Sequence, residues 1–199
     1  MRDAALLGDI DIATIAAATF YEANGKAGDM SAAIRPLFDQ ARLIGPAFTV
    51  KSLPNDLSAM RRAVDVAPPG YVLVIDAGED GVPIWGGSGT IAARRRGLAG
   101  VVTNGIVRDS AQIRELGFPV FCSGAGLRGG LRQHPGWHNV AVTVGGVLVH
   151  PGDLVVADAD GVVVIAKDRI DAVTKLAKEK AKKEAAREMR LHQGEAYDI

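Results

Sequence analysis

Residues 70–124 read GYVLVIDAGEDGVPIWGGSGTIAARRRGLAGVVTNGIVRDSAQIRELGFPVFCSG, and this stretch dictates the chain topology. Runs rich in Val and Ile are typical of strands that are buried on both faces of a sheet. Such runs occur at residues 70–78, 99–107 and 118–124. The segments between them have helical patterning and end on glycine, at residues 86–97 and 108–117. This order predicts an α/β fold with a parallel βαβαβ segment and right-handed crossovers.

The flanking sequence extends this prediction in both directions. The N-terminal third, to about residue 43, has helical patterning, and a strand and a helix are expected at residues 45–53 and 57–66. Downstream of residue 138, short Val-rich runs alternate with the turn sequences GG, PGD and DADG. This alternation predicts β-hairpins.

A last helix is expected over residues 168–192. Asp168 is a good N-cap, and Asp171 places a negative charge in the first helical turn. The second half of this helix, KEKAKKEAAREMR, has too few large apolar residues to pack fully on its own domain. It is therefore either a solvated arm or a segment that packs on a neighbouring subunit.

Composition excludes several classes of protein. The 199 residues fit a single domain, 1–199, and 48% of them are hydrophobic. Basic and acidic residues both number 23, so the net charge is zero and no nucleic-acid partner is expected. No apolar run approaches the roughly 20 residues that span a bilayer. Asp9 and Asp11 interrupt the segment where a signal peptide would be apolar, and the lone Cys122 suits a reducing compartment. We therefore expect a cytoplasmic protein without a membrane partner.

Two motifs of the βαβαβ segment fall where a strand hands over to a helix. One is the glycine-rich turn Gly86-Gly87-Ser88-Gly89, and the other is the pair Arg108-Asp109. The carboxyl ends of parallel strands meet at one sheet edge, where helix N-termini offer free N–H groups to an anion. Arg108 can hold a carboxylate through two hydrogen bonds, and Asp109 offers an oxygen ligand to a Mg²⁺-type cation. The alternative is a tight turn beside an N-capping aspartate and a surface arginine.

The segment that carries both motifs, residues 84–121, resembles the RraA-like family, which includes the metal-dependent 4-hydroxy-4-methyl-2-oxoglutarate / 4-carboxy-4-hydroxy-2-oxoadipate aldolases. The 20 residues between Gly87 and Arg108 match the family's interval between these motifs. GPAFTV at 45–50 and the PGD and ADADGVVVI motifs within 151–165 match it as well.

The resemblance implies a swivelling β/β/α domain that forms a homotrimer or a hexamer with sites at subunit boundaries. The backbone N–H groups of residues 86–89 would bind a small 2-oxo acid substrate. Arg108 would anchor that substrate as a catalytic residue, and Asp109 would be the second catalytic residue and would bind Mg²⁺ or Mn²⁺. Glu184 would reach the site of the next subunit from the C-terminal helix, or else it is a solvated helix residue.

The reaction implied by the resemblance is the cleavage of 4-hydroxy-2-oxo di- and tricarboxylic acids to pyruvate. Oxaloacetate decarboxylation is expected too, because it passes through the same pyruvate enolate, which a divalent cation stabilises as a Lewis acid. The family's namesake instead binds and inhibits an endoribonuclease, so a non-catalytic interaction protein is the alternative. The presence of both Arg108 and Asp109 favours the enzyme.

Three positions depart from the family pattern. Gln112 stands where an acidic residue is frequent, Gly87 where some aldolases have aspartate, and Asn104 where a VDG-like run is common. The first two departures leave fewer acidic groups around the cation. The physiological substrate therefore stays open.

Two other chemistries receive little support. Lys51 lies in an apolar strand pattern, as a Schiff-base lysine would, but an outward-facing strand lysine is the simpler interpretation. His134 and His138 have the spacing of helical zinc ligands, but Pro135 and Gly136 break the helix that such a site needs.

Overall fold

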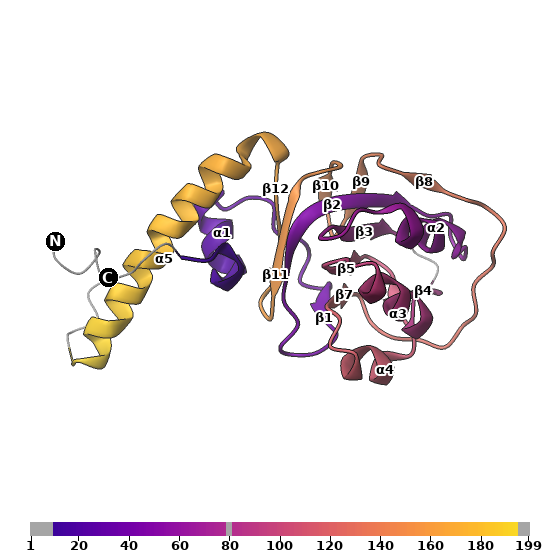
Figure 1. Cartoon of the computed structure of the whole chain (residues 1–199), viewed down its shortest axis with the longest axis horizontal. Helices are drawn as coiled ribbons and strands as arrows, with labels where there is room; N and C mark the ends of the chain where they lie inside the picture. The colour runs from indigo at the N-terminus through magenta and orange to yellow at the C-terminus, as the bar shows by residue number, and fades with distance from the viewer. Residues whose placement is uncertain (1–9, 79–80, 195–199) are drawn as a thin grey trace.

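The computed structural model describes residues 10–78 and 81–194, and its centre is a strongly curved sheet (Figure 1). Neighbouring strands follow the order β1-β7-β5-β3-β2-β11-β12, and β8 adds to β2. The strands of this sheet are β1 (Arg35–Pro36), β2 (Leu43–Lys51), β3 (Val72–Asp76), β5 (Gly100–Thr103), β7 (Val120–Cys122), β8 (Trp137–His138), β11 (Leu154–Asp158) and β12 (Gly161–Ile165).

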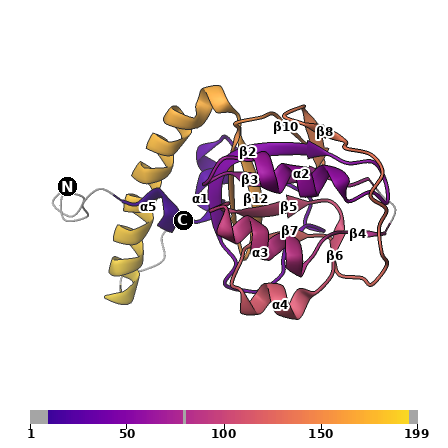
Figure 2. The ribbon, with the colours of Figure 1, turned by 45° about the vertical axis from the view of Figure 1, so that its right-hand side comes forward.

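The predicted parallel βαβαβ segment is confirmed. Strands β2, β3, β5 and β7 are parallel neighbours, with Val72 opposite Ala47 and Gly100, and Val101 opposite Val120. The crossovers contain α2 (Ser58–Val66), α3 (Gly87–Arg95) and α4 (Ser110–Glu115). Figure 2 shows α2 and α3 in front of the parallel strands and α4 below them.

Side chains alternate between the two faces of the central strands, as the pleat of a strand requires. Leu73 and Ile75 of β3 pack in the cluster that contains Met60 of α2 and Ile113 of α4. Val72 and Val74 face the other way and pack against the hairpin of β9 (Val142–Val144) and β10 (Val147–Val149). One face of strands β11 and β12 closes over the same side, since Val155, Val162 and Val164 belong to this second cluster, and their other face packs with α1 and α5. The result is a β/β/α layering.

The hairpin prediction is also confirmed. Strands β9 and β10 pair antiparallel across Gly145-Gly146, and β11 pairs antiparallel with β12 across the turn at residues 159–160. Both glycines have positive φ, +57° and +81°, which suits a two-residue hairpin turn.

The C-terminal helix α5 (Ile170–His192) lies at the end of the molecule away from α3 and α4 (Figure 1). Its start differs from the prediction: Asp168 lies in the short 3-10 helix η3 (Lys167–Arg169), and Arg169 occupies the N-cap without a side-chain hydrogen bond. The tight turn delays the α-helix by two residues. Val173 and Ala177 pack with Phe20 of α1 (Ala17–Ala23), and the residues after 185 are mostly exposed.

The prediction of a helical N-terminal third is wrong. Helical structure is limited there to α1 and the 3-10 helix η2 (Ile12–Thr14) within the residues described. Gly25 and Gly28 have φ of +74° and +88°, outside the right-handed helical region. A Cβ at Gly28 would lie 2.2 Å from the Val164 carbonyl oxygen, so the chain after α1 runs directly against β12. Tertiary packing therefore overrides the alanine-rich local pattern.

None of the helices in the described ranges is long and apolar enough to cross a bilayer.

Candidate active site

A small second sheet brings the two predicted motifs together. β4 (Pro83–Trp85) leads into α3, and β6 (Ile106–Val107) leads into the Arg108-Asp109 pair. The two strands pair in parallel, and the Arg108 N–H donates to the Trp85 carbonyl oxygen at 3.0 Å. The glycine turn and the Arg108-Asp109 pair therefore begin side by side.

This small sheet exists because the predicted strand 99–107 is split at Asn104-Gly105. The Asn104 side chain accepts the Ala77 N–H at 2.8 Å and donates to Asp76 Oδ1 at 3.1 Å. A Cβ on Gly105 would lie 2.8 Å from the Ala77 Cβ, so this close approach needs glycine. The break lets β6 leave the main sheet and join β4.

Asp109 occupies the N-cap of α4 but does not cap that helix with its side chain. Its Oδ2 instead accepts the Gly87 N–H at 3.0 Å, at the start of α3, and lies 3.8 Å from Arg108 Nε. The backbone of Asp109 is left-handed, with φ of +58°. Aspartate tolerates this region better than most residues, and such outliers concentrate at functional sites. The simple N-cap interpretation therefore does not describe this side chain.

The glycines of the turn make room for neighbouring side chains. A Cβ on Gly86 would lie 2.9 Å from Asp109 Oδ2 and 3.2 Å from Arg108 Cγ. A Cβ on Gly87 would lie 1.7 Å from Gln112 Oε1. The two departures from the family pattern, Gly87 and Gln112, are therefore in contact: the amide fills the space that a side chain at position 87 would take.

Trp85 forms the floor beneath the turn. Its indole is buried, and Nε1 donates to Thr90 Oγ1 at 2.8 Å, which in turn donates to the Gly86 carbonyl oxygen at 3.1 Å. A Cβ on Gly89 would contact the indole at 3.6 Å. This chain of hydrogen bonds fixes the turn relative to the floor.

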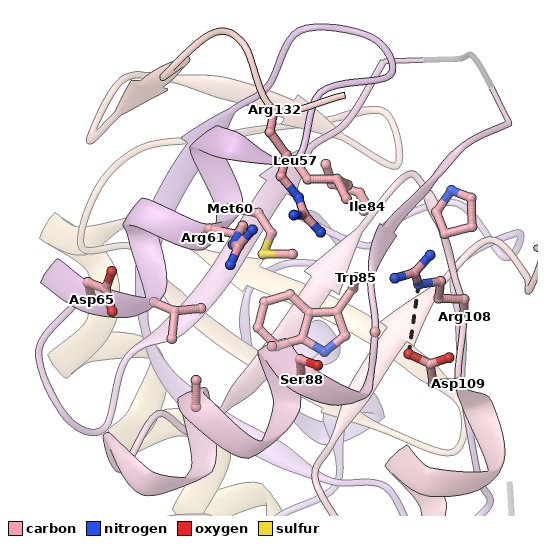
Figure 3. A pocket seen from close by; sticks show the side chains of 15 residues that line it. Leu57, Met60, Arg61, Asp65, Ile84, Trp85, Ser88, Arg108, Asp109 and Arg132 are labelled. Atoms are coloured by element: carbon pink, nitrogen blue, oxygen red, sulfur yellow. Dashed lines mark ion pairs between the residues drawn. The ribbon is translucent and has the colours of Figure 1, made fainter. Parts of the chain in front are cut away.

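The turn and the Arg108-Asp109 pair line a pocket of about 270 Å³ (Figure 3). This volume is close to the lower end of the roughly 300–1,000 Å³ of ligand pockets. The lining residues are Leu57, Met60, Arg61, Val64, Asp65, Pro83, Ile84, Trp85, Gly86, Ser88, Gly89, Ala92, Arg108, Asp109 and Arg132. Three arginines and two aspartates give the wall a net positive charge, which favours an anionic guest.

The residues of the glycine turn have two different roles. Gly86, Ser88 and Gly89 line the pocket, whereas Gly87 is buried and its N–H is used by Asp109. The N–H groups of Ser88 and Gly89 belong to the first turn of α3, where no intrahelical acceptor exists. Together with Arg108 they offer donors to an anion at this end of the pocket.

Two of the arginines that line the pocket, Arg61 and Arg132, were not predicted from the sequence. Arg61 lies on the exposed side of α2, and Arg132 lies in the loop between β7 and β8, 23 residues after Asp109. Leu131 pairs with the segment before α2: its N–H donates to the Asn55 carbonyl oxygen at 2.7 Å, and it accepts the Leu57 N–H at 3.0 Å. The sequence shows Arg132 only as a basic residue in a glycine-rich segment. The residues around it do not indicate that this loop packs against the start of α2.

Asp56 holds the same loop through its carboxylate. Oδ2 accepts the N–H groups of Gln133 at 2.8 Å and His134 at 2.9 Å, and Oδ1 accepts the Ser58 N–H at 2.8 Å. Burial alone would raise the pKa of Asp56, but the hydrogen bonds from Ser58, Gln133 and His134 outweigh it and lower the pKa to about 2. Asp56 therefore stays ionised and ties the start of α2 to the loop that carries Arg132.

The remaining predicted residues lie elsewhere. Glu184 is on α5, and its carboxylate accepts the Thr19 hydroxyl at 2.9 Å and lies 3.4 Å from Lys180 Nζ. Within one chain it is remote from the pocket, because α5 lies at the other end of the molecule (Figure 1). Lys51 is ion-paired to Asp76 at 2.5 Å rather than facing the pocket.

The two histidines are engaged with backbone groups. His138 Nε2 lies 2.8 Å from the Ala59 carbonyl oxygen, and His134 Nδ1 accepts the Gly136 N–H at 3.1 Å. No group of three or more His, Cys, Asp or Glu side chains suited to a metal occurs within residues 10–78 and 81–194. A cation at Asp109 would therefore depend on water and substrate oxygens, as Mg²⁺ commonly does.

The sequence profile of the RraA-like family, described as Aldolase/RraA, matches residues 1–164. The chain belongs to the RraA-like family. A protein of Halalkalibacterium halodurans that is provisionally named 4-hydroxy-4-methyl-2-oxoglutarate aldolase is 38% identical over 161 residues, which are 80% of this chain and 77% of that protein. These findings confirm the resemblance seen in the sequence.

Solved RraA-like structures have the same fold. Streptomyces coelicolor RraAS2, described as an unusual member of the RNase ES inhibitor RraA family, superposes with a TM-score of 0.78 at 31% identity and covers 88% of this chain and 93% of its own. The RNA-processing inhibitor RraA of Thermus thermophilis gives a TM-score of 0.68 at 26% identity, with 74% and 90% covered. The RraA-like fold thus includes relatives named for catalysis and relatives named for inhibition.

Proposed function

We propose that this chain is a divalent-metal-dependent lyase that cleaves 4-hydroxy-2-oxo di- and tricarboxylic acids to pyruvate and also decarboxylates oxaloacetate. The observation that carries the proposal is the meeting of Arg108, Asp109 and the glycine turn at one pocket, with Asp109 Oδ2 3.0 Å from the Gly87 nitrogen. The name of the Halalkalibacterium relative supports the same reaction class.

The positive wall explains how a 2-oxo acid would bind. Arg108 is half-buried at the mouth of the turn, and its planar guanidinium matches the two oxygens of a carboxylate. The N–H groups of Ser88 and Gly89 add donors from a helix N-terminus, where the helix dipole also favours negative charge. These donors stay in place as negative charge develops on the substrate, so they favour an enolate over the neutral ketone.

Asp109 fits a Mg²⁺ or Mn²⁺ ion by the chemistry of its free oxygen. Oδ2 is used by Gly87, while Oδ1 forms no hydrogen bond within the residues described, and the side chain is 45% exposed. A single carboxylate is a common protein contribution to a Mg²⁺ site. When bound there, the cation would supply Lewis-acid stabilisation of the enolate charge. Asp109 would hold it beside the anion that Arg108 orients.

Apolar side chains form part of the pocket wall beside Arg108 and Asp109. Leu57, Met60 and Ile84 line it together with the buried Trp85 indole. An apolar wall lowers the local dielectric constant, so the donors at Arg108 and the turn would act more strongly on charge that develops over this floor than they would in bulk water.

The assembly and location belong to the same proposal. We infer a cytoplasmic homotrimer or hexamer in which Glu184 of one subunit approaches the pocket of the next. The exposed residues 187–190 near the end of α5 support this arrangement, because they offer a surface on which a neighbouring subunit could pack.

A non-catalytic inhibitor of an endoribonuclease is the second candidate. The descriptions of the two solved RraA proteins favour it, since both name inhibition of RNA processing or of a ribonuclease. A protein that acts only through its surface does not require a positive pocket with Arg108 and Asp109 in it.

Pyruvate release separates the two candidates. The chain is incubated with 4-hydroxy-4-methyl-2-oxoglutarate and with oxaloacetate, with Mg²⁺ or with EDTA. The lyase proposal expects Mg²⁺-dependent pyruvate formation that EDTA abolishes. Absence of pyruvate under all conditions, together with tight binding to a ribonuclease, would establish the inhibitor instead.

A further inference from the structure

The pocket carries two further arginines to which the proposed reaction has not yet assigned a role. Arg61 and Arg132 both line it, one from α2 and the other from the loop between β7 and β8. In Figure 3 their guanidinium groups lie above the Trp85 indole, on the side away from Ser88 and Asp109. Within the ranges 10–78 and 81–194, neither guanidinium forms an ion pair or hydrogen bond with another protein group.

The two segments that carry Arg61 and Arg132 are hydrogen-bonded to the same side chain, Asp56. Asp56 binds the backbone at Ser58, Gln133 and His134 at once, so the start of α2 and the Arg132 loop are fixed to each other. Because α2 and this loop are held together, the positive charges of Arg61 and Arg132 lie on the same wall of the pocket. Like charges that face one cavity repel each other, and an anion between them removes that repulsion.

Charge counting gives the class of ligand. Arg108 and a cation at Asp109 account for the 2-oxo acid end of a substrate. Arg61 and Arg132 add two positive charges, and Asp65 is the only other acidic side chain among the residues that line the pocket. A monocarboxylic 2-oxo acid would leave these two arginines without an acceptor, whereas a dicarboxylic one would not.

We propose, building on the lyase function above, that Arg61 and Arg132 form a subsite for the distal carboxylate of a 2-oxo dicarboxylic acid whose 2-oxo end lies at Arg108. The planar guanidinium groups bind a carboxylate with defined geometry. A site built to pair with a charged group discriminates strongly against the analogue that lacks it. Arg61 and Arg132 therefore determine specificity and leave the chemistry to Arg108 and Asp109.

A matched pair of ligands tests the subsite directly. 2-Oxoglutarate and 2-oxopentanoate have the same carbon chain and differ only in the distal carboxylate. Titration calorimetry of the full chain with Mg²⁺ is expected to show at least about tenfold tighter binding of 2-oxoglutarate, a difference of about 1.4 kcal/mol. Equal affinities for the two acids would overturn the proposal.

Variants of the two arginines sharpen the test. R61Q and R132Q are expected to weaken 2-oxoglutarate binding about tenfold and to leave 2-oxopentanoate binding unchanged. R62Q and R128Q are the controls, because these exposed arginines share α2 and the loop but do not line the pocket. Equal weakening of both ligands in R61Q and R132Q, or an equal effect in the controls, would contradict the subsite.

Turnover distinguishes failure of the subsite from failure of the lyase proposal. R132Q is expected to raise KM for oxaloacetate with little change in kcat. Pyruvate formation with an unchanged KM in R61Q and R132Q overturns the subsite alone. A wild-type chain that releases no pyruvate, yet prefers 2-oxoglutarate through Arg61 and Arg132, overturns the lyase proposal and supports the subsite.

Discussion

Asp109, at the start of α4, accepts the backbone N–H of Gly87, at the start of α3, with 3.0 Å between Oδ2 and nitrogen. This hydrogen bond joins two helix N-termini that are 22 residues apart in sequence. It holds the carboxylate beside Arg108 and leaves Oδ1 without a hydrogen bond among the residues described.

Removing the charge of Asp109 tests its role while its hydrogen bond with the Gly87 N–H is kept. In D109N the amide oxygen still accepts the Gly87 N–H, so the thermal midpoint is expected to stay close to that of wild type. Loss of the anionic ligand is expected to lower Mg²⁺-dependent pyruvate release about 100-fold. D39N, which changes an exposed aspartate that does not line the pocket, is the matched control. Full activity in D109N would remove Asp109 from the site.

Arg108 is expected to act through its shape as well as its charge. R108K keeps one positive charge but loses the two-pronged grip on a carboxylate. Steady-state kinetics with oxaloacetate should show KM raised about tenfold and kcat lowered. A variant that matches wild type in both constants would show that Arg108 does not hold the substrate.

The two neighbouring glycines are expected to respond differently to alanine. G86A places a methyl group 2.9 Å from Asp109 Oδ2 and 3.2 Å from Arg108 Cγ, so both functional side chains must shift and activity should fall at least about tenfold. In G87A the severe contacts of the methyl group are with the end of the flexible Gln112 side chain, which is exposed and can swing away, while the Asp109 Cβ lies 3.3 Å away and has to move by only a few tenths of an ångström. G87A should therefore retain most of its activity. Parallel assays of both variants check this, and equal losses would contradict the geometry.

The ionisation of Asp56 makes the free energy of unfolding depend on pH in the acidic range. Its pKa is about 2 in the folded chain against an ordinary value of 3.8, so its stabilising contribution is present above about pH 4 and is lost as the pH falls toward 2. D56N removes an anionic acceptor from three N–H donors and is expected to lower the free energy of unfolding by roughly 1–3 kcal/mol at pH 6.

The pH dependence distinguishes the charge of Asp56 from simple packing. Urea unfolding at pH 6 and pH 3 is expected to show a smaller gap between wild type and D56N at the lower pH. A gap that is the same at both pH values would mean that the Asp56 charge contributes nothing to stability.

The central fold could be predicted because its signals are local. The Val- and Ile-rich strands of the βαβαβ segment, the glycine-terminated helices and the Gly145-Gly146 hairpin all follow from neighbouring residues. The N-terminal third could not, because the path after α1 is set by contact of Gly28 with β12. The delayed start of α5 depends likewise on the turn at η3.

The candidate site was half visible in the sequence. Arg108, Asp109 and the glycine turn were expected close together, but the strands that they follow, β6 and β4, form a separate small sheet that the sequence did not predict. Arg61 and Arg132 reach the pocket only because Asp56 and Leu131 fasten a distant loop to α2. Apart from the Asp56 carboxylate, that fastening uses backbone N–H and carbonyl groups, which every residue carries, so the sequence does not show which loop Asp56 binds.

Proton exchange at pyruvate C3 tests enolate stabilisation most directly. Exchange requires only that the enolate forms and is protonated again, and no carbon–carbon bond has to break. Pyruvate is incubated with the chain and Mg²⁺ in D₂O, and the methyl signal is followed by ¹H NMR. Wild type is expected to exchange the methyl protons with deuterium far faster than D109N, R108K or wild type with EDTA. No exchange above the buffer rate, or exchange at the same rate in all four samples, would contradict the proposed site.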